Sequence, residues 1–168
     1  MITSTFDVIL GEPYFYIRNG EVSEFTDLYW KLKRINSKKT ITKVVRGQKC
    51  MTVEKLFDEF SAVYQFPYYF SANWNSFEEC INDLAWLQAD AYIMCISNAE
   101  NLLQLSNSDF DSFTSILADS VREWQDGRNL GAVVTSSTPF NIIFHCAKEN
   151  EYELIMKLRE SGILLERL

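Results

Sequence analysis

Two pairs of acidic residues have the type and spacing that acid–base chemistry would use. Glu78 and Glu79 are adjacent in a segment of helical spacing, and Asp109 and Asp111 stand two residues apart at the start of a later one. Two carboxylates can act as general acid and general base when both reach one substrate atom. Adjacent helix residues diverge by about 100°, so Glu78 and Glu79 cannot converge on one atom. Asp109 and Asp111 fall in a first helical turn, where carboxylates complement the helix dipole.

The one histidine and four cysteines could supply a nucleophile or a metal site only if they met in space. His145 directly precedes Cys146 in a segment of strand character, so their side chains should point to opposite faces. Cys50, Cys80 and Cys95 are scattered, with no C-x-x-C pair, which argues against a zinc site or a redox motif. We therefore expect free, buried thiols.

The sequence also lacks the motifs of the common cofactor-binding and hydrolase families. It contains no glycine-rich nucleotide loop, no G-x-S-x-G and no H-E-x-x-H. An oxygen-rich divalent metal site would need a loop that is not recognisable among the acids. We predict a protein that is not an enzyme, with no catalytic residue, no cofactor and no metal. A hydrolase that uses the acidic pairs is the remaining enzymatic alternative.

Charge is distributed unevenly along the 168 residues, whose formal net charge is −7. Residues 58–119 contain no Lys or Arg, while eight of the 16 basic residues fall within residues 31–49. An acidic field of this kind repels nucleic-acid phosphates and attracts basic proteins. It predicts a basic protein partner and no nucleic-acid partner. The simpler alternative is an acidic surface that only keeps the protein soluble.

The N-terminal segment MITSTFDVILGEP has no basic region and reaches an acidic residue before its apolar run ends, so it is a poor signal peptide. No apolar run approaches the roughly 18–20 residues that span a bilayer. We predict a cytoplasmic protein with no membrane partner.

Strand and helix patterns alternate along the chain. Strand-like runs occupy residues 6–10, 14–18, 40–45, 91–96 and 140–146. The first two are expected to form a hairpin, and the unbroken apolar character of the fourth predicts that it is the central strand. Helical spacing follows Ser23, Thr52, Asn73 and Ser108, with a short helix after Ser97 or Asn98 and a helix and edge strand in the tail. This alternation predicts an α/β fold with a small, mainly parallel β-sheet and flanking helices.

We expect a single domain over residues 1–168. Its core would span residues 40–147, with an N-terminal strand and helix extension over residues 1–39 and a C-terminal helix and strand as a further addition. No long Pro-, Gly- or Ser-rich linker divides the chain.

The segment FPYYFSANWNSFEEC, residues 66–80, places three consecutive aromatic residues, Tyr68 to Phe70, before a helix opened by Asn73. Tyr68, Tyr69 and Phe70 cannot all point inward, so at least one should be exposed. On the helix, one face is apolar and would pack, while Asn75, Glu79 and Asn82 share another face. Exposed aromatic side chains next to fixed charges are typical of protein-binding hot spots.

This segment and its surroundings resemble the barstar family of ribonuclease inhibitors. The resemblance runs over about residues 40–144: a strand, a Gly, a Thr-capped helix, FPYYF and NWNSFEECINDLAWL. It implies an inhibitor that inserts this helix and the preceding loop into a ribonuclease active site, with an acid in place of the RNA phosphate. Tyr69 then matches the loop aromatic, Asn75 a position usually held by Asp, and Glu79 the central acid. A further acidic contact falls near Glu123, where Arg122 competes for the position.

The predicted function is inhibition of a basic microbial ribonuclease or nuclease toxin domain, as an immunity or antitoxin protein. The alternative is an interaction module on the same scaffold with a non-nuclease partner, in which residues 1–39 supply a different surface. Asn75 removes one charge of the family pattern, and Glu78 stands where well-known members have a large aromatic residue. The predicted partner-binding residues are Tyr69, Asn75, Glu78, Glu79, Asn82, Asp83 and Glu123.

Overall fold

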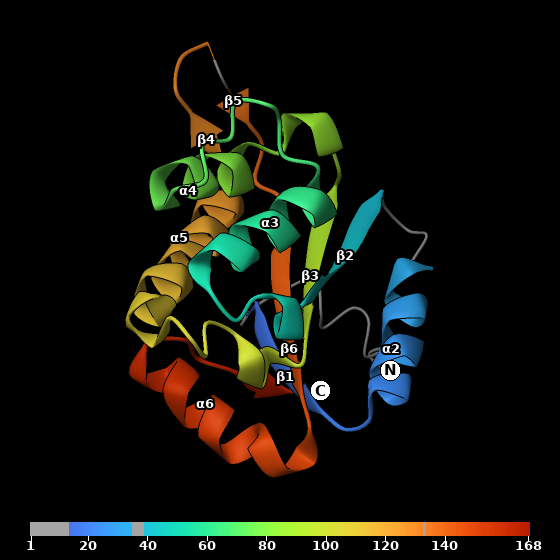
Figure 1. The fold of residues 1–168 in the computed structure, drawn as a ribbon. Coiled ribbons are helices and arrows are strands. Elements are labelled where there is room, and N and C mark those ends of the chain that lie inside the picture. Colours follow the sequence, from blue (N-terminus) through green and yellow to red (C-terminus); the bar gives the residue numbers. More distant parts are fainter. Residues whose placement is uncertain (1–13, 35–38, 133) are drawn as a thin grey trace.

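A parallel five-stranded sheet runs through the protein, as shown by a computed structural model that describes residues 14–34, 39–132 and 134–168 (Figure 1). The strand order is β2-β3-β6-β1-β7, and each of these pairings is parallel. The strands are β1 (Phe15–Asn19), β2 (Thr40–Arg46), β3 (Ala91–Ser97), β6 (Phe140–Cys146) and β7 (Glu166–Arg167). A separate antiparallel hairpin is formed by β4 (Arg128–Asn129) and β5 (Val134–Thr135). The predicted α/β class with a mainly parallel sheet is confirmed.

The buried strands follow from their apolar sequences. Every residue of β3 and β6 is buried, as expected for interior strands of a parallel sheet covered on both faces. The strand that we expected to be central, β3, is interior, but β6 holds the middle position.

The strand predicted at residues 14–18 is observed as β1, and it is also interior. Its neighbours are β6 and β7, both parallel to it and both from the C-terminal part of the chain. Its predicted hairpin partner, residues 6–10, lies outside the described residues. The division into a core and two additions stays a prediction, but a strand of the N-terminal extension belongs to the same sheet as β2, β3 and β6.

The helices cover the two faces of the sheet unequally. They are α2 (Val22–Lys33), α3 (Val53–Tyr64), α4 (Trp74–Asp83), α5 (Phe110–Asp126) and α6 (Glu151–Glu160). Buried residues of α3, α4, α5 and α6 form one core with Ile17, Met94 and Phe144. Phe25 and Leu32 of α2 form a second core with residues that alternate with these along the strands. Of the helices in the described residues, four cover one face and α2 covers the other (Figure 1).

The short helix predicted after β3 forms only as a 3-10 helix, Ala99–Asn101, with Asn98 at its N-cap position. It does not continue, and Leu103 adopts a left-handed φ of 52°. The backbone N–H groups of Leu103 and Leu105 donate to the carbonyls of Cys50 and Met51, at 2.8 and 2.9 Å. These bonds to a distant segment replace the i to i−4 bonds that a helix would have made.

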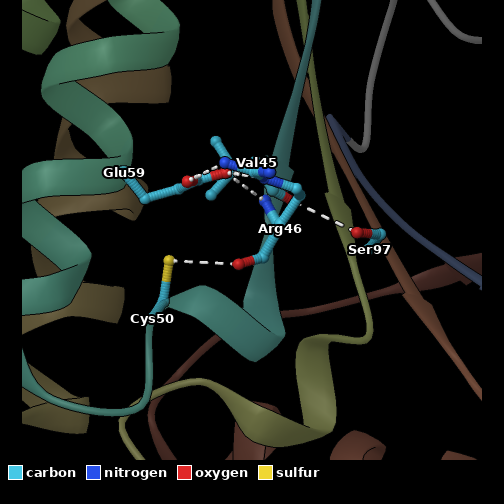
Figure 2. Close-up of polar contacts among 5 residues, drawn as sticks. All are labelled: Val45, Arg46, Cys50, Glu59 and Ser97. Carbon is cyan, nitrogen blue, oxygen red and sulfur yellow. Dashed lines mark hydrogen bonds and ion pairs between the residues drawn. The ribbon is translucent and has the colours of Figure 1, made fainter.

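An ion pair between a buried carboxylate and a half-exposed guanidinium fixes α3 to the end of β2 (Figure 2). The Arg46 guanidinium donates to both carboxylate oxygens of Glu59, at 2.7 Å each, and the Arg46 backbone N–H donates to Oε1 at 3.1 Å. Glu59 is 6% exposed, whereas the Arg46 side chain is 56% exposed. The hydrogen bonds from Arg46 lower the pKa of the Glu59 carboxyl because they stabilise its charged form.

This pair should make stability depend on pH. Because the pKa of Glu59 is lower in the folded than in the unfolded state, its contribution is present above the unfolded value, about 4.3, and is lost as the pH falls through the folded value. We expect Glu59→Gln to cost about 1–2 kcal/mol at pH 7, since the partner is half exposed. Urea denaturation at several pH values should show the difference in unfolding free energy between the wild type and Glu59→Gln becoming smaller in acid. Glu54→Gln, an exposed change on the same helix, is the control. If the stability difference between the wild type and Glu59→Gln did not vary with pH, the role given to this ion pair would be contradicted.

Candidate protein-interaction surface

Helix α4 is held in a fixed position by its caps and its apolar face. The Asn73 side-chain oxygen accepts from the Ser76 backbone N–H at 2.9 Å, as the sequence predicted for a capping residue. Phe77 and Ile81 are fully buried. The Trp124 indole N–H of α5 donates to the Ile81 carbonyl at 2.9 Å. These contacts orient the opposite face of α4 toward solvent.

The loop before α4 presents aromatic side chains in a defined conformation. The Phe70 ring packs edge-on against Phe57 of α3, with centroids 5.8 Å apart. The Phe70 backbone N–H donates to the Pro67 carbonyl at 3.0 Å, which closes a tight turn. Tyr68 is fully exposed and Tyr69 is 51% exposed. The prediction that at least one of the three consecutive aromatic residues is exposed is confirmed.

Tyr69 and the acids of α4 lie on one surface. Asn75 and Glu79 are exposed, and Glu78 and Asp83 are partly buried. Partial burial raises the pKa of the Tyr69 phenol, and the charges of Asp83 and Glu79 raise it further. These charges act on the phenol because both carboxylates lie near it. An aromatic side chain and two carboxylates are thus presented together.

The structure brings Asn82 and Glu123 together, but as an internal contact. Asn82 is 6% exposed, and its amide donates to a Glu123 carboxylate oxygen of α5 at 3.0 Å. The other Glu123 oxygen pairs with the Arg128 guanidinium at the start of β4. The resemblance left open whether Glu123 or Arg122 takes the position of the further acidic contact. Glu123 faces α4, whereas Arg122 is exposed and pairs with Asp119 at 3.4 Å.

Arg128 is a residue of this surface that sequence reasoning missed. Its guanidinium neutralises the only acid that α5 contributes beside Asn82. The sequence feature that could have predicted this contact is Gly127. It ends the helix and turns the chain, so that residue 128 can return toward Glu123.

His145 and Cys146 lie on opposite faces of the sheet. His145 stacks on Phe25 with ring centroids 4.5 Å apart, while Cys146 lies in the core on the other face. The His145 Nδ1 accepts from the Asn98 backbone N–H at 3.2 Å, and Nε2 lies 3.0 Å from the Gly20 carbonyl oxygen. The two residues therefore do not form a pair.

All four cysteines are free and buried, as predicted. Burial raises the pKa of the Cys50, Cys95 and Cys146 thiols to about 12 and that of Cys80 to about 11. In residues 14–34, 39–132 and 134–168, no group of three or more His, Cys, Asp or Glu side chains is placed to hold a metal ion. Within the same ranges, no helix has the length and apolar character needed to cross a membrane.

Two comparisons with known proteins bear on this surface. A family model described as barstar, the barnase inhibitor, matches residues 40–136. The match spans the Tyr69 loop, all of α4 and all of α5. A search of curated proteins gave no match.

Proposed function

The chain belongs to the barstar family, and on this premise we propose that it inhibits a basic microbial ribonuclease by covering the enzyme's active site with α4 and the loop before it. The family description names inhibitors, and no part of the proposal requires catalysis. The observation that carries it is the exposed Glu79 carboxylate beside the half-exposed Tyr69 ring on a helix fixed by buried contacts.

The proposed mechanism is mimicry of an RNA phosphate. A ribonuclease keeps Arg and Lys side chains in its active site to bind phosphate, and a carboxylate on a rigid helix can accept charge-assisted hydrogen bonds from them. Tyr69 adds apolar contact area and loses little conformational entropy on binding. Asn75 and Asp83 flank this pair on α4. Both carboxylate oxygens of Glu123 are bonded within the chain, so in this mechanism Glu123 contributes mainly by positioning Asn82.

The base-free acidic segment supports rapid association with such an enzyme. Like-signed charges over a surface steer an oppositely charged partner and raise association rates by about 10–1,000-fold at low salt. We further propose that the protein acts in the cytoplasm as an immunity or antitoxin protein, where it would protect its producer from the nuclease.

The direct test is an RNA-cleavage assay with purified protein. Barnase, other small basic ribonucleases and any nuclease encoded by an adjacent gene are mixed with increasing amounts of the protein. We expect at least one of these enzymes to be fully inhibited near a 1:1 ratio, with inhibition that weakens as NaCl is raised. Activity that persists at a large excess of the protein over every enzyme would contradict the proposal.

A second candidate function has one specific observation in its favour. Trp30 of α2 is 47% exposed, and the Lys33 ammonium lies 5.2 Å from its ring, which makes an aromatic and basic patch outside the matched residues. A non-nuclease partner could bind there. Deleting residues 1–39 would remove β1, an interior strand, so Trp30→Ala is the cleaner change. Partner binding that depends on Trp30 and not on Glu79 would favour this second function.

A further inference from the structure

A groove of about 780 Å³ lies beside the end of α4, next to the proposed interaction surface. One side is formed by Asp83 and the turn that follows α4, and the other by residues 134–139, which lead from β5 into β6. Tyr92 and Trp124, both almost fully buried, line it, and their ring centroids are 5.0 Å apart. The groove thus combines an aromatic lining with an acidic side, and Asp83 belongs both to it and to the α4 surface.

The wall of the groove formed by residues 134–139 is fixed to the end of α5. The Thr138 backbone N–H donates to the Trp124 carbonyl at 2.8 Å. Gly127 has a φ of +76°, and a Cβ there would lie 2.7 Å from the Thr135 carbonyl oxygen. Only glycine allows the segment to pass this close. The groove is therefore preformed, so a ligand need not order this wall when it binds.

The charges around the groove favour a cation. Asp83 and Asp90 line it, against a single basic residue, Lys39. Asp90 is occupied in part, because one of its oxygens accepts from the Lys39 backbone N–H at 3.0 Å. Asp83 takes part in no ion pair within the described part of the chain.

We propose that the groove receives an arginine side chain of the partner nuclease, as a second anchoring point beside Glu79. The inference rests on the proposed function and adds to it a defined subsite. The guanidinium would donate to the Asp83 carboxylate, and its aliphatic stem would cover apolar surface along the groove, beside the buried Tyr92 and Trp124.

The first experiment tests the groove without the nuclease. Nα-acetyl-arginine amide is titrated into ¹⁵N-labelled protein, with Nα-acetyl-citrulline amide as a neutral probe of nearly the same shape. We expect the arginine probe to shift the resonances of Asp83, Tyr92 and the Trp124 indole, and Asp83→Asn to reduce these shifts severalfold. Equal, small shifts with both probes would overturn the proposal.

The second experiment tests the same groove in the complex. Asp83→Asn, and Ser136→Trp from the opposite wall, should each raise the dissociation rate of the nuclease complex about tenfold, which corresponds to roughly 1.4 kcal/mol. Asp119→Asn, an exposed carboxylate change on α5, should leave the rate unchanged.

The two experiments separate the two ideas. If the arginine probe binds in the groove while the protein inhibits no nuclease, the proposed function fails and the groove remains a site for a cationic side chain. If a nuclease is inhibited while Asp83→Asn and Ser136→Trp leave its dissociation unchanged, the function stands and the assignment of the groove to the partner's arginine is overturned.

Discussion

Replacing Glu79 with alanine is expected to weaken binding of the partner ribonuclease by about 2–5 kcal/mol, or roughly 30- to 4,000-fold. Glu79 is the exposed central acid of α4, and the proposed complex buries it against cationic side chains of the enzyme. Removing the carboxylate leaves those cations desolvated and without a partner, which accounts for the large effect. Most of the loss should appear as faster dissociation.

The measurement is a dissociation constant from surface-based kinetics, with RNA cleavage as a second readout. Glu160→Ala removes an exposed glutamate from the end of α6, away from the site, and serves as the charge-matched control. It should change affinity by less than about threefold, since distant exposed charges are screened by salt. Full inhibition by the Glu79→Ala protein would show that the inhibitory site lies elsewhere.

Phe77→Ala is expected to have the largest effect on stability, about 3–5 kcal/mol. Phe77 is completely buried on the inner face of α4. Its ring contacts Phe60 of α3 and Phe113 of α5, with centroids 5.1 and 6.2 Å away. Truncation would leave a cavity where three helices meet, and the packed neighbours cannot fully close it.

Urea denaturation with a conformational probe measures this loss. Phe77→Leu retains much of the volume and should cost clearly less, while Tyr152→Ala, an exposed aromatic change on α6, should cost less than about 0.5 kcal/mol. If Phe77→Ala were no more destabilising than Tyr152→Ala, the packing of α4 described above would be wrong. Because α4 carries the proposed site, the folded fraction of the Phe77→Ala protein should also bind its partner less tightly.

Local features of the fold could be read from the sequence. Thr52 and Asn73 were predicted as capping residues, and each side chain accepts a backbone N–H three residues ahead. The apolar runs of β3 and β6 predicted buried strands. These features depend on residues close together in the chain, whose backbone bonds and side-chain directions follow from helix and strand geometry alone.

The exposed part of the candidate surface was also predictable, because it lies on a single segment. The spacing within α4 placed Phe77 and Cys80 inward, and Asn75 and Glu79 outward, as observed. The aromatic run before it exceeded what one turn could bury, so at least one exposed ring was predicted, and Tyr68 and Tyr69 are exposed. The Glu79→Ala experiment tests whether these residues bind a nuclease.

The contacts that join distant segments were decided only by the tertiary structure. The sequence alone determined an α/β chain with a capped, amphipathic α4 next to exposed aromatic residues. It did not determine that β1 lies between β6 and β7, that Arg128 neutralises Glu123, or that Asp83 faces residues 134–139 across a groove. The strand order and these long-range contacts depend on how the helices pack against the sheet. The hydrophobic periodicity of a helix or strand shows which of its faces is buried, but not which distant segment that face meets.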